Sequence, residues 1–181
     1  MSTESKNKKL KLWELNRVSD EVYKEQAKNP IVIVLDDIRS LNNIGSFFRT
    51  ADAFNVEKIY LCGICACPPH RDIHKTALGA TETVAWEYRS NILELTSELK
   101  QQGYAVCTVE QTEETTMLQD IHALPDEKFA LVFGNEVNGV NQQVIDASNY
   151  VIEIPQFGTK HSLNVSVCAG IVMWEFCKRY I

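Results

Sequence analysis

The sequence predicts one α/β domain built on a mostly parallel sheet that helices flank on both faces. Strand-like and helix-like segments alternate along the chain, which is typical of repeated βα units. Two strand-like segments, residues 31–35 and 129–133, are continuous apolar runs, as expected of parallel strands buried on both faces. The length of 181 residues suits a single domain, and no linker, repeat or low-complexity stretch divides the chain.

Boundary signals along the chain place the individual elements. An amphipathic helix is expected over residues 19–28, because Ser19 is a good N-cap and Pro30 cannot continue a helix. Gly103 is the expected C′ glycine of a second helix. After the strand at 31–35, the expected elements are a helix at 43–54, strands at 58–61 and 84–88, a helix at 90–102, strands at 104–109 and 129–133, a helix at 141–147, a strand at 150–154 and a long helix at 162–180.

Composition and charge narrow the functional classes. The longest apolar runs are far too short to cross a bilayer, and residues 1–11 carry no apolar stretch of a secretory signal, so we expect a cytoplasmic protein. A net charge of −6 argues against a protein that coats RNA nonspecifically, although a local basic patch would suffice for an RNA enzyme. The N-terminal lysines are either a solvated tail or an arm that grips RNA: Lys6, Lys8, Lys9 and Lys11.

The six cysteines raise the question of a metal or of disulfides. Most have apolar neighbours, and in a cytoplasmic protein we expect them to be free thiols. One group has metal-like spacing: Cys62, Cys65, Cys67, His70 and His74. These residues crowd onto one strand end and the following loop, whereas a structural zinc site joins ligands from two separate turns. We therefore predict no metal.

Polar and glycine-rich segments follow three of the expected strands. In open α/β sheets, ligands bind outside the carboxyl ends of the strands. In the first segment, Asn43 is placed to cap a helix, and Arg49 follows nearly two turns later, so we expect both on roughly one helix face. In the second, Gly134 and Gly139 surround the carboxylate of Glu136, and this segment is either an ordinary loop or backbone held close to a ligand. This spacing is neither the dinucleotide fingerprint nor a P-loop.

The third segment, residues 154–167, leads into the last helix. Ser162 and Asn164 precede the apolar helical run and either cap it or contact a cofactor or an RNA phosphate at the helix N-terminus.

Together and in order, the three segments resemble the signature motifs of the SpoU/TrmH RNA methyltransferases, of the SPOUT class. The matching sequences are Asn43-x-Gly-x-x-x-Arg49-Thr-Ala, Phe-Gly134-Asn-Glu136-x-x-Gly139 and Ile-Pro155…Ser162-Leu-Asn164-Val-Ser. The resemblance runs from about residue 31 to the end of the printed sequence. It implies a catalytic domain at 29–181 with a C-terminal deep trefoil knot, an exception to the rarity of knots, after a partly helical N-terminal extension at 1–28.

The resemblance also implies the chemistry. Members transfer a methyl group from S-adenosylmethionine to a ribose 2′-hydroxyl, and they act as homodimers in which the first motif of one subunit helps to complete the other's site. Arg49 matches the catalytic arginine, and the other polar site residues are Asn43, Glu136, Ser162 and Asn164. The implied cofactor-binding residues are Thr108, Val109, Gly134, Asn135, Ile154, Leu163 and Asn164, with Glu110 at the same strand end.

The role of Arg49 can be narrowed by its chemistry. A guanidinium is almost never deprotonated in proteins, so we expect Arg49 to clamp an RNA phosphate and to favour an alkoxide-like oxygen by its charge. The base is then the phosphate itself, or Arg49 only in a deprotonated form.

The substrate is less well determined by the sequence. The chain is too short to include the extra N-terminal RNA-binding domain of many rRNA enzymes. The Ser-Leu-Asn-Val-Ser motif resembles the corresponding motif of the tRNA guanosine enzymes. We therefore expect RNA as partner, tRNA favoured over rRNA, together with a second copy of the chain, and neither a membrane nor DNA. Two rivals remain: a noncatalytic RNA-binding protein on the same fold, and a nucleotide- or NAD-binding enzyme, although the first βα turn lacks its glycine fingerprint.

Overall fold

The computed structural model describes residues 7–181, which form an α/β domain around one parallel sheet. Within these residues the sheet has seven strands in the order β3-β2-β1-β6-β4-β7-β5, and every neighbouring pair is parallel. The strands are β1 (Asn29–Asp36), β2 (Val56–Cys62), β3 (Trp86–Arg89), β4 (Ala105–Val109), β5 (Thr116–Met117), β6 (Phe129–Phe133) and β7 (Tyr150–Glu153). The predicted parallel α/β sheet is confirmed.

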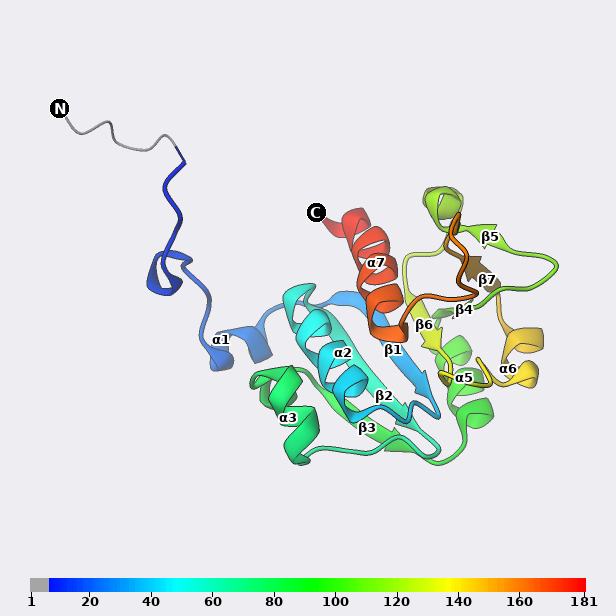
Figure 1. The fold of residues 1–181 in the computed structure, drawn as a ribbon, viewed down its shortest axis with the longest axis horizontal. Helices are drawn as coiled ribbons and strands as arrows, with labels where there is room; N and C mark the ends of the chain where they lie inside the picture. Colours follow the sequence, from blue (N-terminus) through cyan, green and yellow to red (C-terminus); the bar gives the residue numbers. More distant parts are fainter. Residues whose placement is uncertain (1–6) are drawn as a thin grey trace.

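Helices cover both faces of the sheet (Figure 1). Along β1, Ile31, Ile33 and Leu35 pack in the core shared with α2 and α7, whereas Val32 and Val34 face α5 and α6. The helical segments are η1 (Leu12–Glu14), α1 (Asp20–Glu25), α2 (Leu41–Ala53), α3 (Arg71–Ala77), α4 (Ala80–Thr83), α5 (Ile92–Gln101), η2 (Leu118–Ala123), α6 (Gln142–Ala147), α7 (Val165–Cys177) and η3 (Lys178–Tyr180). Burial on both faces explains why β1 and β6 read as unbroken apolar runs.

Helix α2 begins two residues earlier than predicted. The hydroxyl of Ser40 accepts a hydrogen bond from the Asn43 backbone N–H, so Ser40 is the cap and Asn43 lies inside the first turn. The expectation that Asn43 and Arg49 share a face is wrong as well. At about 100° per residue, positions six apart are about 120° apart around the helix, and Asn43 is buried while Arg49 is exposed.

The segment between β2 and β3 contains two helices that the sequence did not predict, α3 and α4. Helix α3 packs tightly on α2 at Gly45, where an added Cβ would lie 2.1 Å from Thr76 Oγ1 and 2.3 Å from the Ile73 carbonyl oxygen. The short strand β5 and the helix η2 were also missed. Elements of this length carry little periodicity of their own and depend on tertiary packing.

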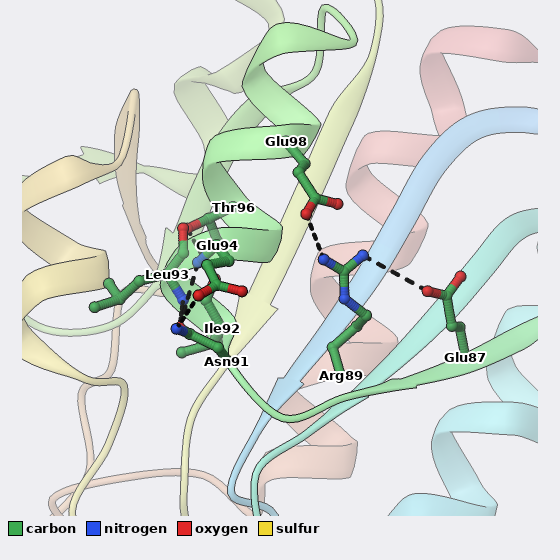
Figure 2. Close-up of polar contacts among 8 residues, drawn as sticks. All are labelled: Glu87, Arg89, Asn91, Ile92, Leu93, Glu94, Thr96 and Glu98. Atoms are coloured by element: carbon green, nitrogen blue, oxygen red, sulfur yellow. Dashed lines mark hydrogen bonds and ion pairs between the residues drawn. The ribbon is translucent and has the colours of Figure 1, made fainter.

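The edge strand β3 and helix α5 carry well-defined polar contacts (Figure 2). Asn91 caps α5, as its side-chain oxygen accepts from the backbone N–H groups of Leu93 and Glu94. Arg89 on β3 pairs with Glu98 of α5 at 2.5 Å and with Glu87 at 3.6 Å. Charged side chains on an edge strand oppose pairing with other sheets.

The last helix starts at Val165, three residues later than predicted, because Asn164 caps it by accepting from the N–H groups of Ser166 and Val167. Ser162 lies outside the helix. Near the chain end, the Arg179 guanidinium donates to the carbonyls of Ile121, Leu124 and Asp126. These bonds attach the C-terminal segment to the connection between β5 and β6.

The cysteine- and histidine-rich segment is packed into the fold. Cys62 and Cys65 are buried, and the Cys65 thiol contacts the Ile38 N–H and the Leu35 carbonyl. His70 caps α3 through the Asp72 N–H. Among the described residues, no group of three or more His, Cys, Asp or Glu side chains is arranged to hold a metal ion. Between residues 7 and 181, no helix has the length and apolar character needed to cross a membrane.

Candidate functional site

A cavity of about 450 Å³ opens at the carboxyl ends of β4, β6 and β7. Its walls come from residues 109–111, the loop 133–139 and the segment 152–168. This is the edge of a parallel sheet at which α/β proteins bind ligands. Two of the three polar segments predicted from the sequence therefore meet in one cavity.

The cavity brings together most of the predicted site residues. Those that line it are Val109, Gly134, Asn135, Glu136, Ile154, Ser162, Leu163 and Asn164. Thr108, Asn43 and Arg49 are not among the lining residues. Thr108 is fully buried, and its hydroxyl lies 2.5 Å from the Ser148 hydroxyl. Its side chain is therefore buried in the fold and lies outside the cavity lining.

The loop after β6 is held by its own hydrogen bonds. Asn135 and Gly139 exchange both backbone bonds, at 3.0 and 2.9 Å. The Asn135 side chain accepts from the N–H groups of Val137 and Asn138 and donates to the Asp37 carbonyl at 2.6 Å. The loop thus presents a preformed wall to the cavity.

Gly134 is required by the loop itself. A Cβ at this position would lie 2.2 Å from both the Gly139 carbonyl carbon and the Val140 nitrogen. The backbone of its own loop therefore accounts for a glycine at this position, and the expectation that this loop holds its backbone close to a ligand stays a prediction for two glycines that line the cavity.

Glu136 links this loop to the start of α2. Its carboxylate accepts hydrogen bonds from the backbone N–H groups of Arg39 and Ser40, both at 3.1 Å, and from Asn43 Nδ2 at 3.0 Å. Burial raises the pKa of Glu136, but the hydrogen bonds from Arg39, from its own N–H, from Asn43 and from Ser40 outweigh burial, so the pKa is lowered. A negative charge at a helix N-terminus is also favoured by the helix dipole.

Asn43 completes the link to the third segment. Its Oδ1 accepts from Asn164 Nδ2 and from Ser166 Oγ, both at 3.3 Å. Ser166 Oγ also donates to Asn164 Oδ1 at 2.7 Å. Sequence reasoning did not assign a role to Ser166, although its place two residues after Asn164 in the same motif was a usable signal. Glu136, Asn43 and Asn164 thus join all three motifs.

Arg49 is not among the residues that line the cavity of its own chain. It is exposed on α2, four residues after Gly45 and three before Asp52, and these positions share one helix face. Gly45 packs on α3, and the Asp52 carboxylate accepts from the Thr83 hydroxyl of α4. Within residues 7–181, the Arg49 guanidinium makes no hydrogen bond or ion pair by the usual distance criteria. Its charge is therefore available to another molecule.

Known proteins share this sequence and fold. The SpoU rRNA Methylase family matches residues 30–174. The 23S rRNA (guanosine-2′-O-)-methyltransferase RlmB of Neisseria meningitidis serogroup B is 30% identical, over 86% of this chain and 61% of its own length. A putative TrmH family tRNA/rRNA methyltransferase of Staphylococcus haemolyticus is 32% identical, over 82% of this chain and 58% of its own length. The chain therefore spans about three fifths of these relatives.

Solved structures agree in fold. The A. aeolicus TrmH/SpoU tRNA modifying enzyme superposes with a TM-score of 0.77 at 24% identity, covering 88% of this chain and 79% of that one. The AdoMet-bound rRNA methyltransferase from Sinorhizobium meliloti superposes with a TM-score of 0.78 at 22% identity, covering 91% and 62%. Because the family match spans residues 30–174 and includes all three motifs, the chain belongs to the SpoU rRNA methylase family.

Proposed function

We propose that this protein transfers a methyl group from S-adenosylmethionine to a ribose 2′-hydroxyl of RNA. The observation that carries the proposal is the cavity at the sheet edge, whose walls are joined by the Glu136–Asn43–Asn164 hydrogen bonds. Family membership and the AdoMet-bound relative of the same fold support the choice of donor. Catalysis of methyl transfer by the purified protein tests it directly.

The residues present suit this donor. Pockets for molecules of this kind measure roughly 300–1,000 Å³ and combine apolar walls with a few polar groups, and the cavity here is about 450 Å³. Ile154 and Leu163 offer apolar surface beside the polar loop at 134–139. When bound, the donor supplies an electrophilic methyl group on a sulfonium.

The chain's own residues align the RNA and shield the reaction from water. We assign to Arg49 the bidentate clamping of an RNA phosphate, with its charge favouring the alkoxide-like oxygen. The proton of the 2′-hydroxyl passes to that phosphate, because a guanidinium is a very poor base. Glu136, Asn43 and Asn164 position the start of α2 against the cavity, and Ser162 offers a hydroxyl at its rim.

We propose that the protein works as a homodimer. Helix α7 buries Ala169, Met173 and Phe176 in its own core but leaves Val167, Ile171 and Trp174 exposed. These three are four and three residues apart and form an apolar stripe on the outer face. A second copy would cover this stripe. It would also bring an Arg49 to a cavity that each chain alone leaves without one.

We further propose that the C-terminal segment is knotted. Strand β7 is inserted between β4 and β5, although β5 follows β4 directly in the chain, so the connection from β4 to β5 must pass around β7. The Arg179 guanidinium donates to the carbonyls of Ile121, Leu124 and Asp126, so the C-terminal segment is fastened to the next connection, between β5 and β6. This arrangement supports a trefoil knot closed by the segments 110–128 and 154–181. A crystal structure traced through both segments tests the proposal.

The RNA substrate is the finer part of the proposal. We favour a guanosine of tRNA because of the amino-acid sequence of the third motif. The alternative substrate is rRNA, because the relative RlmB is named as a 23S rRNA enzyme. Residues 29–181 would carry the activity and residues 1–28 form an extension, in the cytoplasm where both RNAs occur. Mapping 2′-O-methyl groups in total tRNA and rRNA from cells with and without the protein identifies the substrate. A site missing from rRNA alone would overturn the preference for tRNA.

A further inference from the structure

Carboxylates dominate the charge of the cavity. Glu110, Glu136 and Glu153 line it, and its lining within the described chain includes neither lysine nor arginine. Glu136 is engaged by three donors at the start of α2, and Glu153 accepts from the Thr115 hydroxyl at 3.1 Å. Glu110 differs from both because its hydrogen bonds come only from backbone N–H groups, those of Gln111 in the cavity lining and of Val140 next to the lining residue Gly139.

The Glu110 carboxylate packs against the end of the loop that follows β6. Oε2 accepts from the Val140 N–H at 3.2 Å, and Oε1 from the Gln111 N–H at 2.9 Å. A Cβ added to Gly139 would lie 2.3 Å from Oε2, so the carboxylate rests directly on that glycine. On the α7 side, burial and then the negative charge of Glu110 raise the pKa of Cys168 to about 12. The Glu110 carboxylate therefore lies close enough to Cys168 of α7 for its charge to contribute to that shift.

We propose that Glu110 recognises the positive charge of the methyl donor and makes the cavity prefer S-adenosylmethionine over its product, S-adenosylhomocysteine. The inference rests on the proposed placement of the donor in this cavity. In methyl transfer, the carbon–sulfur bond breaks, a carbon–oxygen bond forms, and the hydroxyl proton leaves to the phosphate. The bonding electron pair stays on sulfur, so a sulfonium cation becomes a neutral thioether. A fixed carboxylate attracts the sulfonium cation more strongly than the neutral thioether.

The proposed interaction affects the affinity for the donor and the release of the product, and it does not lower the activation barrier of methyl transfer. The charge on sulfur is already dispersing in the transition state, so Glu110 holds the bound donor more strongly than the transition state. Removing its charge is expected to weaken donor binding without lowering turnover at saturating donor. The same charge lowers the relative affinity for product, which favours its departure.

Calorimetric titrations of three ligands test the inference. S-adenosylmethionine and sinefungin, which carries an ammonium group in place of the methylsulfonium, are positively charged at this centre, and S-adenosylhomocysteine is neutral there. Glu110→Gln removes the charge and nearly preserves the shape. Glu110→Asp keeps the charge, and Glu87→Gln makes the same charge change on the remote edge strand β3 (Figure 2).

The wild type should bind both cationic ligands more tightly than the thioether. In Glu110→Gln that preference should fall roughly tenfold, with little change in affinity for S-adenosylhomocysteine. Glu110→Asp should keep most of the preference, and Glu87→Gln all of it.

Three results would overturn the inference: a wild type without preference, an equal loss for all ligands in Glu110→Gln, or a loss in Glu110→Asp as complete as in Glu110→Gln. An equal loss would mean that Glu110 only supports the Val140 loop. If the wild type bound none of the three ligands, the proposed function would fail first and the inference with it.

Discussion

The side-chain amide of Asn43 donates to the carboxylate of Glu136 at 3.0 Å, across 93 positions of sequence. This hydrogen bond couples the first turn of α2 to the loop that forms one wall of the cavity. Because Asn43 is itself buried, breaking the bond leaves polar groups without partners. The integrity of the proposed site should therefore depend on this pair.

Replacing Asn43 should loosen the link between the motifs. Asn43→Asp places a second carboxylate against Glu136, so we expect a loss of about 1–3 kcal/mol in the free energy of unfolding. The pKa of Glu136 is lowered in the folded protein, so its stabilising contribution is present above the ordinary glutamate pKa and is lost as the pH falls through the lowered one. Urea unfolding of Asn43→Asp beside Asn42→Asp, an exposed neighbour, checks the first effect, and acid titration of wild type against Glu136→Gln the second. Equal stability of the two aspartate variants would contradict the link.

Arg49→Ala should abolish methyl transfer while leaving the affinity for S-adenosylmethionine nearly unchanged. Arg49 does not line the cavity, and its exposed guanidinium is assigned to the RNA. Losing an electrostatic group that acts in the transition state costs about a hundredfold or more in turnover. Arg49→Lys should fail nearly as badly, since an ammonium cannot reproduce the planar fork. Calorimetry of the donor and tritium transfer to bulk tRNA measure the two effects, and near wild-type turnover of Arg49→Ala would refute the assignment.

Gly134→Ala should lose stability and donor binding together. The added Cβ meets the backbone at Gly139 and Val140, which cannot give way as a flexible side chain would. Gly158→Ala is a matched control in the third segment, because its Cβ would meet nothing within 4 Å. Thermal unfolding with and without donor separates the outcomes. A Gly134→Ala protein of normal stability that bound no donor would restore direct ligand contact as the reason for the glycine.

Charge on the outer face of α7 should separate the proposed dimer. Ile171→Glu with Trp174→Glu puts two carboxylates into the apolar stripe, so sedimentation at micromolar concentration should show a monomer where the wild type is a dimer. Val22→Glu, an equally exposed apolar position on α1, should leave the dimer intact. A wild type that sediments as a monomer would contradict the proposal. Mixing Arg49→Ala with a Gly134 variant then asks whether two defective chains share one working site.

Removing residues 1–11 should weaken RNA binding without unfolding the domain. Lys8, Lys9 and Lys11 are exposed, while Lys6 lies outside the described residues. Each lysine–phosphate interaction that the truncation removes should flatten the dependence of log K on log salt by about one unit. RNA binding at several salt concentrations, beside circular dichroism of the truncated protein, measures both effects. An unchanged slope would mean that the tail is merely solvated.

The local sequence was sufficient to predict strands that are buried on both faces and helices whose ends are marked by capping or terminating residues. Both ends of the strand at 129–133 were predicted correctly. A continuous apolar run between polar segments is favoured where both faces of a strand are buried. The short helices α3 and α4 were not predicted because they depend on tertiary contacts with α2, at Gly45 for α3 and between Thr83 and Asp52 for α4, which no local sequence pattern indicates.

The features of the site likewise divide into those that the sequence predicted and those that depend on tertiary contacts. The sequence by itself placed Gly134, Glu136, Ser162 and Asn164 at strand ends, and in a parallel sheet the carboxyl ends meet at one edge, so their gathering around one cavity was predictable. Only the tertiary structure decided that Ser40 caps α2 and frees Asn43 to bond Glu136 and Asn164. It also decided that Gly134 packs against the backbone of Gly139 and Val140, and that Arg49 lies outside the cavity lining. Such contacts join residues far apart in the chain, and their partners are chosen by helix rotation and packing, which the order of residues along one segment does not specify.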